Sequence, residues 1–134
     1  MSTLILIIIA IILAFWFFII GNRKTSPDWK IYVSQRLNIL SKSSKLKDKT
    51  KISSIFIELD KLLDYCLKME SYGGTTLAQR LKQSRYKFDA TMYNELWRAH
   101  KLRNRLVHDI NFNFDNHIYE SIDVYIKAIK IIIK

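Results

Sequence analysis

An apolar repeat at helical spacing over residues 51–70 constrains the fold more than any other feature of this sequence. The whole chain of 134 residues contains only three glycines and one proline, so little in it interrupts a helix. The sequence therefore predicts an all-α protein in which residues 51–70 form the strongest core helix. Its apolar side chains recur every three or four residues and so share one helix face: Ile52, Ile55, Phe56, Leu59, Leu62, Leu63, Cys66 and Leu67.

Other segments of the chain have the same amphipathic pattern. Glycines follow the core helix and are expected to end it by adopting a positive φ. A Ser- and Lys-rich stretch precedes it and indicates a linker. Since the remaining connections are short, the helices are expected to pack as an antiparallel bundle. The further predicted helices span residues 26–40, 75–84, 89–108 and 115–133.

The N-terminal part of the chain is an apolar run without an ionisable side chain, from Leu4 to Ile20. With its flanking residues it is just long enough to span the ~30 Å hydrocarbon core of a bilayer. A cleaved signal peptide fits less well, because no Lys or Arg precedes the run and bulky aromatic residues end it. We therefore expect residues 4–20 to contact a lipid bilayer as a transmembrane helix.

Positive charges at Arg23 and Lys24 follow the apolar run directly. By the positive-inside rule, this predicts a single-pass membrane protein with its N-terminus outside and its C-terminal domain in the cytoplasm. The predicted fold class is all-α, with an N-terminal transmembrane helix followed by a small antiparallel helical bundle. The expected division is a signal anchor over 1–22, a juxtamembrane helix and linker over 23–50, and the bundle over 51–134.

The chain carries a formal net charge of +10 and one cysteine, Cys66. The charge suits an anionic partner, either nucleic acid or lipid headgroups, although a solvated basic surface explains it equally well. The cysteine forms no intrachain disulfide and lies in the apolar repeat, so we expect a buried core thiol. The sequence has no zinc-type ligand spacing, no glycine-rich phosphate loop and no nucleophile elbow.

The helix predicted over residues 89–108 has a charged residue in its apolar stripe. On an ideal helix, Arg103 falls among Met92, Leu96, Ala99 and Leu106. A guanidinium in that position needs a carboxylate, a set of carbonyls, a subunit boundary or a ligand. Asn104 and His108 are four residues apart and share a face, whereas Arg103 and His108 lie roughly 140° apart. They can converge only if the helix ends or distorts near His108, or if a second copy of the chain supplies one of them.

The spacing Arg103-Asn104-x-x-x-His108 resembles the catalytic motif of the HEPN superfamily, a group of small all-α domains that are often ribonucleases. The resemblance covers residues 50–134 and implies a HEPN-like bundle that dimerises so that two motifs meet at the interface. It also implies a metal-independent endoribonuclease without a cofactor, which leaves 2′,3′-cyclic phosphate ends on RNA. A protein partner such as an antitoxin is a further expectation.

The resemblance assigns a role to each motif residue. His108 would be the general acid/base, Arg103 would stabilise the phosphate, and Asn104 would orient one of them. Lys101 and Arg105, on other faces of the helix, would bind the RNA backbone.

Two other interpretations of the same residues stay open. Arg103 can pair with Asp60, Asp109 or Asp115 and serve only the fold. The protein would then be a non-catalytic, membrane-anchored module that dimerises or binds RNA or another partner. In the second interpretation it is a basic protein whose lysines face a lipid surface.

Overall fold

The computed structural model describes Ile12, residues 28–45 and residues 48–134. These described residues form five α-helices and one short 3-10 helix, without a β-strand. The prediction of an all-α protein is therefore confirmed. The helices are α2 (Asp28–Ser43), α3 (Lys49–Met69), α4 (Leu77–Gln83), α5 (Ala90–His108) and α6 (His117–Ile133), and the 3-10 helix η1 (Arg85–Lys87) connects α4 to α5.

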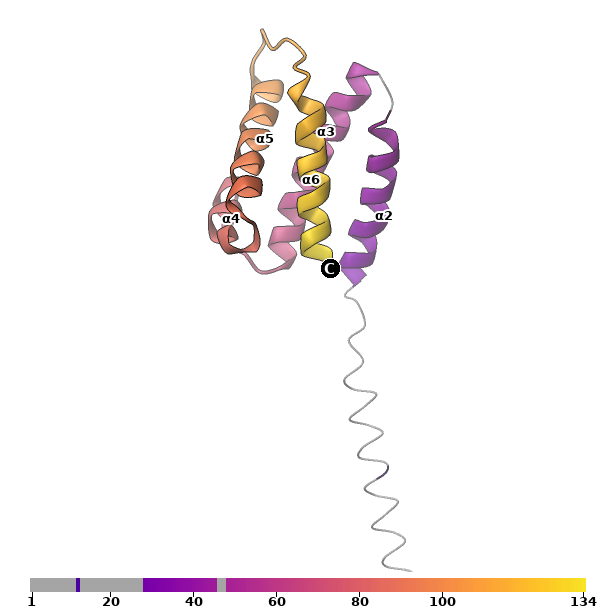
Figure 1. Ribbon diagram of the computed structural model, residues 1–134, viewed down its shortest axis with the longest axis vertical. Coiled ribbons are helices and arrows are strands. Elements are labelled where there is room, and N and C mark those ends of the chain that lie inside the picture. Colours follow the sequence, from indigo (N-terminus) through magenta and orange to yellow (C-terminus); the bar gives the residue numbers. More distant parts are fainter. Residues whose placement is uncertain (1–11, 13–27, 46–47) are drawn as a thin grey trace, which may run out of the picture.

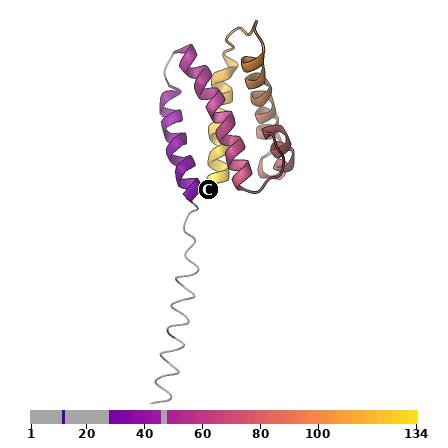
Figure 2. The ribbon, with the colours of Figure 1, turned by 180° about the vertical axis from the view of Figure 1, so that it is seen from behind.

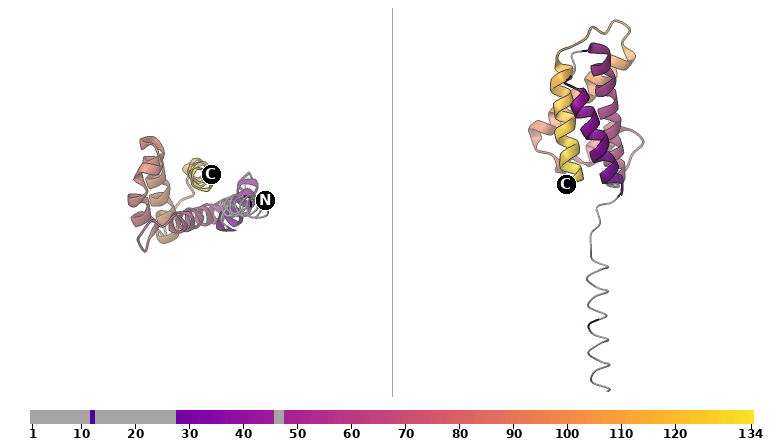
Figure 3. Two further views of the ribbon diagram at one scale, coloured as in Figure 1. Left: turned by 90° about the horizontal axis from the view of Figure 1, so that it is seen from below. Right: turned by 90° about the vertical axis from the view of Figure 1, so that its right-hand side faces the viewer.

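The four long helices lie side by side with alternating directions (Figure 1). Helix α6 lies in front in Figure 1, and α3 comes to the front when the molecule is seen from behind (Figure 2). Seen from below, α6 lies over a row formed by α2, α3 and α5 (Figure 3). The most extensive packing joins α3 to α6 and α5 to α6, and the short helix α4 packs against α3. This arrangement is the antiparallel helical bundle that the sequence predicts.

The apolar repeat of α3 forms the centre of the core, as predicted. Every member of that repeat is buried, and Phe56 stacks against Tyr125 of α6 with 5.5 Å between ring centroids. Burial raises the pKa of the Cys66 thiol to about 12, and the nearby Glu70 carboxylate adds to the shift. Cys66 is therefore a buried core thiol.

Helix α2 contributes to the same core. Its buried residues Val33, Leu37 and Leu40 face α3 and α6. The described chain leaves helical structure after Ser43 and enters α3 at Lys49, where the Asp48 side chain accepts from the backbone N–H groups of the first turn. The Ser- and Lys-rich stretch predicted as a linker thus includes the end of α2 and the start of α3.

Side-chain caps fix most helix starts, but the end of α3 differs from the prediction. Asp89 and Thr76 cap α5 and α4 by accepting a backbone N–H in the first turn. At the end of α3 the left-handed residue is Ser71, with φ of 66°, rather than a glycine. Among the described residues, Gly74 is the one other residue with a positive φ, of 119°, and a Cβ there would lie 2.6 Å from the Cβ of Gln79.

The predicted fold class needs one correction, concerning the N-terminal transmembrane helix. No helix within the described part of the chain is long and apolar enough to cross a membrane. Helices α2 to α6 carry charged residues along their exposed faces, because each buries only one side against the bundle. The predicted anchor at 1–22 falls outside the described residues except for Ile12. The structure therefore supports an all-α bundle and does not support an N-terminal transmembrane helix.

Candidate functional site

A buried carboxylate, Asp60 of α3, is the centre of the most polar region inside the bundle. The residue is only 4% exposed. The Tyr125 hydroxyl donates to Asp60 Oδ1 at 2.7 Å, and His100 Nδ1 lies 2.8 Å from the same oxygen. Arg103 Nε lies 3.3 Å from the other oxygen, Oδ2. Because a buried carboxylate without partners is strongly unfavourable, these three groups make the position of Asp60 tenable.

Asn104 joins two of these partners to each other. Arg103 Nη1 donates to Asn104 Oδ1 at 3.0 Å, and Asn104 Nδ2 lies 3.3 Å from His100 Nε2. With its amide oxygen toward Arg103, Asn104 presents N–H to His100, so His100 Nε2 must accept. The imidazole proton is then on Nδ1, where it donates to Asp60. Asp60, His100, Asn104 and Arg103 form a closed ring of polar contacts, which we call the Asp60 ring.

The local sequence explains how the ring assembles. Arg103 and Asn104 follow His100 by three and four residues, so all three side chains lie on one side of α5. Asp60 lies within the buried face of α3, and Tyr125 comes from the buried face of α6. Burial raises the pKa of the Tyr125 hydroxyl, and the charge of Asp60 raises it further. Tyr125 therefore stays protonated and donates to the carboxylate.

The Asp60 ring borders a cavity of about 450 Å³ between α3, α4 and α5. Arg103 is partly exposed, with 19% of its side-chain surface accessible. Its Nε is nevertheless shielded from solvent and makes no hydrogen bond, because the contact with Asp60 is an ion pair without hydrogen-bond geometry. The residues that line the cavity are Asp60, Lys61, Asp64, Thr76, Leu77, Ala78, His100, Arg103 and Asn104.

The predicted general acid/base, His108, lies away from this ring. It is the last residue of α5 and is exposed. The helix runs regularly to this point, and the N–H of Asp109 donates to the carbonyl of Arg105 at 2.9 Å. Arg103 and His108 therefore keep their separation of about 140° around α5. One copy of the chain brings Arg103 and Asn104 together but leaves His108 apart.

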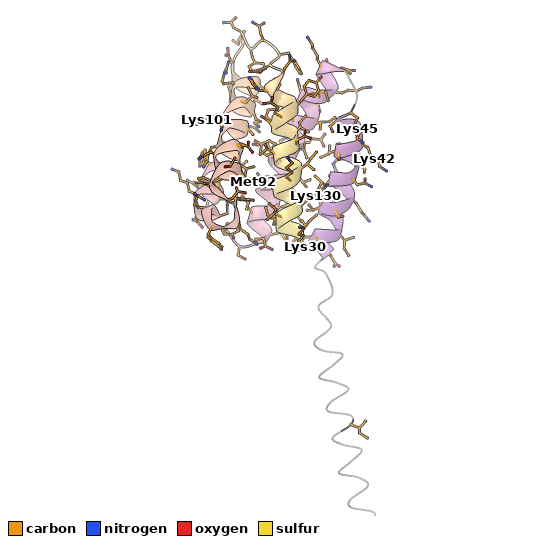
Figure 4. All side chains as sticks on the ribbon, viewed as in Figure 1. Lys30, Lys42, Lys45, Met92, Lys101 and Lys130 are labelled. Carbon is orange, nitrogen blue, oxygen red and sulfur yellow. The ribbon has the colours of Figure 1, made fainter. Side chains whose placement is uncertain are left out.

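Lys101 and Arg105, the predicted RNA-binding residues, lie on another side of α5. Both are exposed and line a groove between α5 and α6. Figure 4 shows Lys101 in the half of α5 nearer the connection to α6. The groove also contains Arg98 and His117, together with the acidic residues Glu95, Asp115 and Glu120. The structure thus places the two predicted RNA-binding residues together and separates them from the cavity beside Arg103.

Sequence reasoning missed the contacts that His100 and Tyr125 make with Asp60. It left His100 out of the candidate site and named Asp60 only as one of three carboxylates that can pair with Arg103. A signal was present, since Asp60 interrupts an otherwise apolar helix face between Phe56 and Leu63. A carboxylate in such a stripe requires buried partners, as a guanidinium does.

Together these observations define a class of structure: an all-α bundle with a carboxylate-supported Arg–Asn pair beside a cavity. Residues 28–45 and 48–134 contain no group of three or more His, Cys, Asp or Glu residues placed to hold a metal ion. Comparison with protein-family models, with characterised proteins and with solved structures gives no match. Membership of the HEPN superfamily therefore stays a prediction based on the motif at Arg103–His108.

Proposed function

We propose that the protein is a HEPN-like, metal-independent endoribonuclease. The 2′-hydroxyl of RNA attacks the adjacent phosphorus, a bond forms between the 2′ oxygen and phosphorus, and the bond to the 5′ oxygen breaks. His108 accepts the proton from the 2′-hydroxyl, and the leaving 5′ oxygen takes up a proton from water. The products are a 2′,3′-cyclic phosphate and a 5′-hydroxyl end.

The observation that carries the proposal is the way Arg103 is held beside the cavity. Asp60 lies against its Nε and Asn104 accepts from its Nη1. Nη2 has no hydrogen-bond partner among the residues described. A fixed guanidinium with unused N–H groups suits an RNA phosphate, whose charge increases in the transition state. Asn104 fits the role of orienting Arg103.

The geometry of α5 favours a composite site made by two copies of the chain. Arg103 and His108 of one copy face different directions, so His108 of a second copy would have to approach the cavity beside Arg103. The exposed position of His108 at the end of α5 makes it available for such a contact. A homodimer is therefore part of this proposal.

The ion pair between Arg103 and Asp60 also supports a second candidate function. Asp60 neutralises Arg103 inside the fold, which is the arrangement expected if Arg103 serves only stability. The protein would then be a non-catalytic helical module that dimerises or binds RNA or a protein partner. Cleavage activity distinguishes the two candidates.

The test uses the full-length chain, its His108→Ala variant and a control variant, Asn111→Ala. Asn111 is exposed and lies three residues beyond His108 in the same connection. Each protein is incubated with mixed RNA in EDTA, and the ends of the products are analysed. We expect the parent and the control to leave 2′,3′-cyclic phosphate ends, and the His108→Ala variant to be slower by about 10²–10⁴-fold.

Two results would contradict the ribonuclease proposal. Equal cleavage by all three proteins identifies a contaminating nuclease, because His108 would then have no role. No cleavage by a folded parent dimer supports the non-catalytic module. Circular dichroism of the three proteins shows whether helix content is equal, so that loss of fold is not mistaken for loss of catalysis.

A further inference from the structure

The Asp60 ring suggests a function for residues outside the motif. We propose that Asp60 is a positioning residue that acts through Arg103, and that His100 and Tyr125 support it by fixing the carboxylate. This inference rests on the proposed ribonuclease function for its kinetic consequences. The geometry of the ring itself can be tested separately.

Arg103 is held from two sides by residues that are themselves held. Asp60 lies against Nε, and its other oxygen is occupied by Tyr125 and His100. Because Oδ1 receives those two donors, the carboxylate cannot rotate freely, and Oδ2 stays directed at Arg103. On the other side, Asn104 accepts from Nη1 while its own NH₂ faces His100. Both contacts to the guanidinium therefore lead back to one buried carboxylate.

The same contacts occupy both ring nitrogens of His100 and so favour a positioning role for it over proton transfer. In the hydrogen-bond assignment above, Nδ1 donates to Asp60 and Nε2 accepts from Asn104. Its side chain is only 12% exposed. Taking a proton from RNA at Nε2 would break the contact with Asn104, which also orients Arg103. His100 is thus suited to positioning, and the exposed His108 remains the proton acceptor.

One feature distinguishes this arrangement from an isolated ion pair. The carboxylate of Asp60 has three partners, which come from two helices. Replacing a buried ion pair by apolar residues often leaves stability unchanged or higher, so stability alone gives no reason for such a cluster. The need to orient Arg103 beside the cavity does give a reason for the cluster.

The kinetic test compares full-length Asp60→Asn and Tyr125→Phe with the parent. Asparagine keeps an acceptor for Tyr125 and the shape of the side chain, but it removes the charge facing Arg103. A displacement of about 1 Å in a catalytic group can cost about 10²-fold in rate. We expect Asp60→Asn to lower kcat for RNA by about 100-fold and to change KM by less than about threefold. Tyr125→Phe leaves the ion pair intact and should lower kcat by about fivefold.

Glu58→Gln is the matched control. Glu58 is also a carboxylate of α3 that pairs with an arginine, Arg36 of α2, but it lies outside the cavity beside Arg103. We expect its kcat to equal that of the parent. The proposal is overturned if folded Asp60→Asn and Tyr125→Phe both keep kcat within twofold of the parent, or if their losses appear only in KM. If Asp60→Asn does not fold, Tyr125→Phe alone decides the kinetic test.

Nuclear magnetic resonance tests the ring without reference to activity. In the parent we expect the His100 proton on Nδ1, and an Arg103 Nε–H signal that exchanges more slowly than those of exposed arginines. In Asp60→Asn that signal should exchange faster, as at an exposed arginine. A His100 proton on Nε2, or an Arg103 signal unchanged in the variant, would overturn the positioning role. If the parent cleaves no RNA but these signals are as expected, the ribonuclease function fails while the positioning of Arg103 by Asp60 stands.

Discussion

The positively charged side chains on two sides of helix α5 have different surroundings. On the side toward α3, Arg103 pairs with Asp60 and hydrogen bonds to Asn104, whose amide faces His100. On the side toward α6, Lys101 and Arg105 are exposed along a groove. The first side fixes one guanidinium through a network, whereas the second offers cations that solvent screens. The same helix therefore holds one arginine in a fixed position on one side and leaves exposed cations beside acidic residues on the other.

The difference follows from the helices that pack on each side. Helix α3 presents the carboxylate of Asp60 within an apolar face. Burial strengthens each hydrogen bond and ion pair that this carboxylate makes, because little solvent screens them. Helix α6 presents Glu120 beside the groove, where its side chain is 78% exposed and pairs with His117. Exposed pairs contribute little, because water and salt screen them. Substitutions on the two sides should consequently differ in size and in salt dependence.

The largest expected difference is in cleavage of RNA. Arg103→Ala should lower kcat by about 10²–10³-fold at any salt concentration, because it removes a donor aimed at the transition state. Arg105→Ala should weaken RNA binding only several-fold, and the loss should shrink between about 50 and 200 mM salt, because phosphate contacts by exposed cations depend on counterion release. Rates measured at both salt concentrations check this. Equal losses in the two variants would remove the distinction between the sides.

Stability should show a smaller difference between the sides. Asp60→Ala leaves His100, Arg103 and Tyr125 without their shared partner, and we expect the free energy of unfolding to fall by about 3 kcal/mol. Glu120→Ala removes one member of an exposed pair and should leave the unfolding free energy nearly unchanged. Urea titration of both variants measures this. A loss for Glu120→Ala as large as that for Asp60→Ala would show that the groove side is also cooperatively packed.

The smallest expected effect is the titration of His117 on the groove side. Its hydrogen bond with Glu120 raises its pKa above the ordinary value of 6.5, and the charge of Asp115 adds to the shift. Because its pKa is higher in the folded state, His117 stabilises the fold. This contribution is fully present below pH 6.5 and is lost as the pH rises through the pKa of His117 in the folded protein. The midpoint of His117, followed by nuclear magnetic resonance, should lie above 6.5 and move back toward it in Glu120→Gln. A midpoint at or below 6.5 in the parent would show that the pair does not form in solution.

Much of the fold could be predicted from local patterns. The apolar repeat of α3, the caps at Thr76 and Asp89 and the short connections identify the bundle, because helix formation and amphipathic burial depend on residues within a few turns of one another. The N-terminal transmembrane helix in the predicted fold class was the part that the structure does not support. The left-handed residue at Ser71 was also missed, because the glycines that follow were expected to adopt that conformation.

The candidate site was only partly predictable. The apolar stripe around Arg103 indicated that this residue needs a partner, and Asn104 was expected to orient a neighbour. The choice of Asp60 over Asp109 and Asp115 depends on contacts between segments about forty residues apart. Spacing along one helix carries no information about such contacts. The same spacing did indicate that His108 faces a different direction.

The sequence by itself determined that this protein is a helical bundle and that Arg103 lies in an apolar stripe, because helical periodicity is a property of neighbouring residues. Only the tertiary structure decided that His100, Arg103 and Tyr125 meet around the Asp60 carboxylate. It also decided that Lys101 and Arg105 face a separate groove. The reason is that a buried charge can pair only with groups that the packed helices place within hydrogen-bond distance of it. That selection depends on how α3, α5 and α6 pack together.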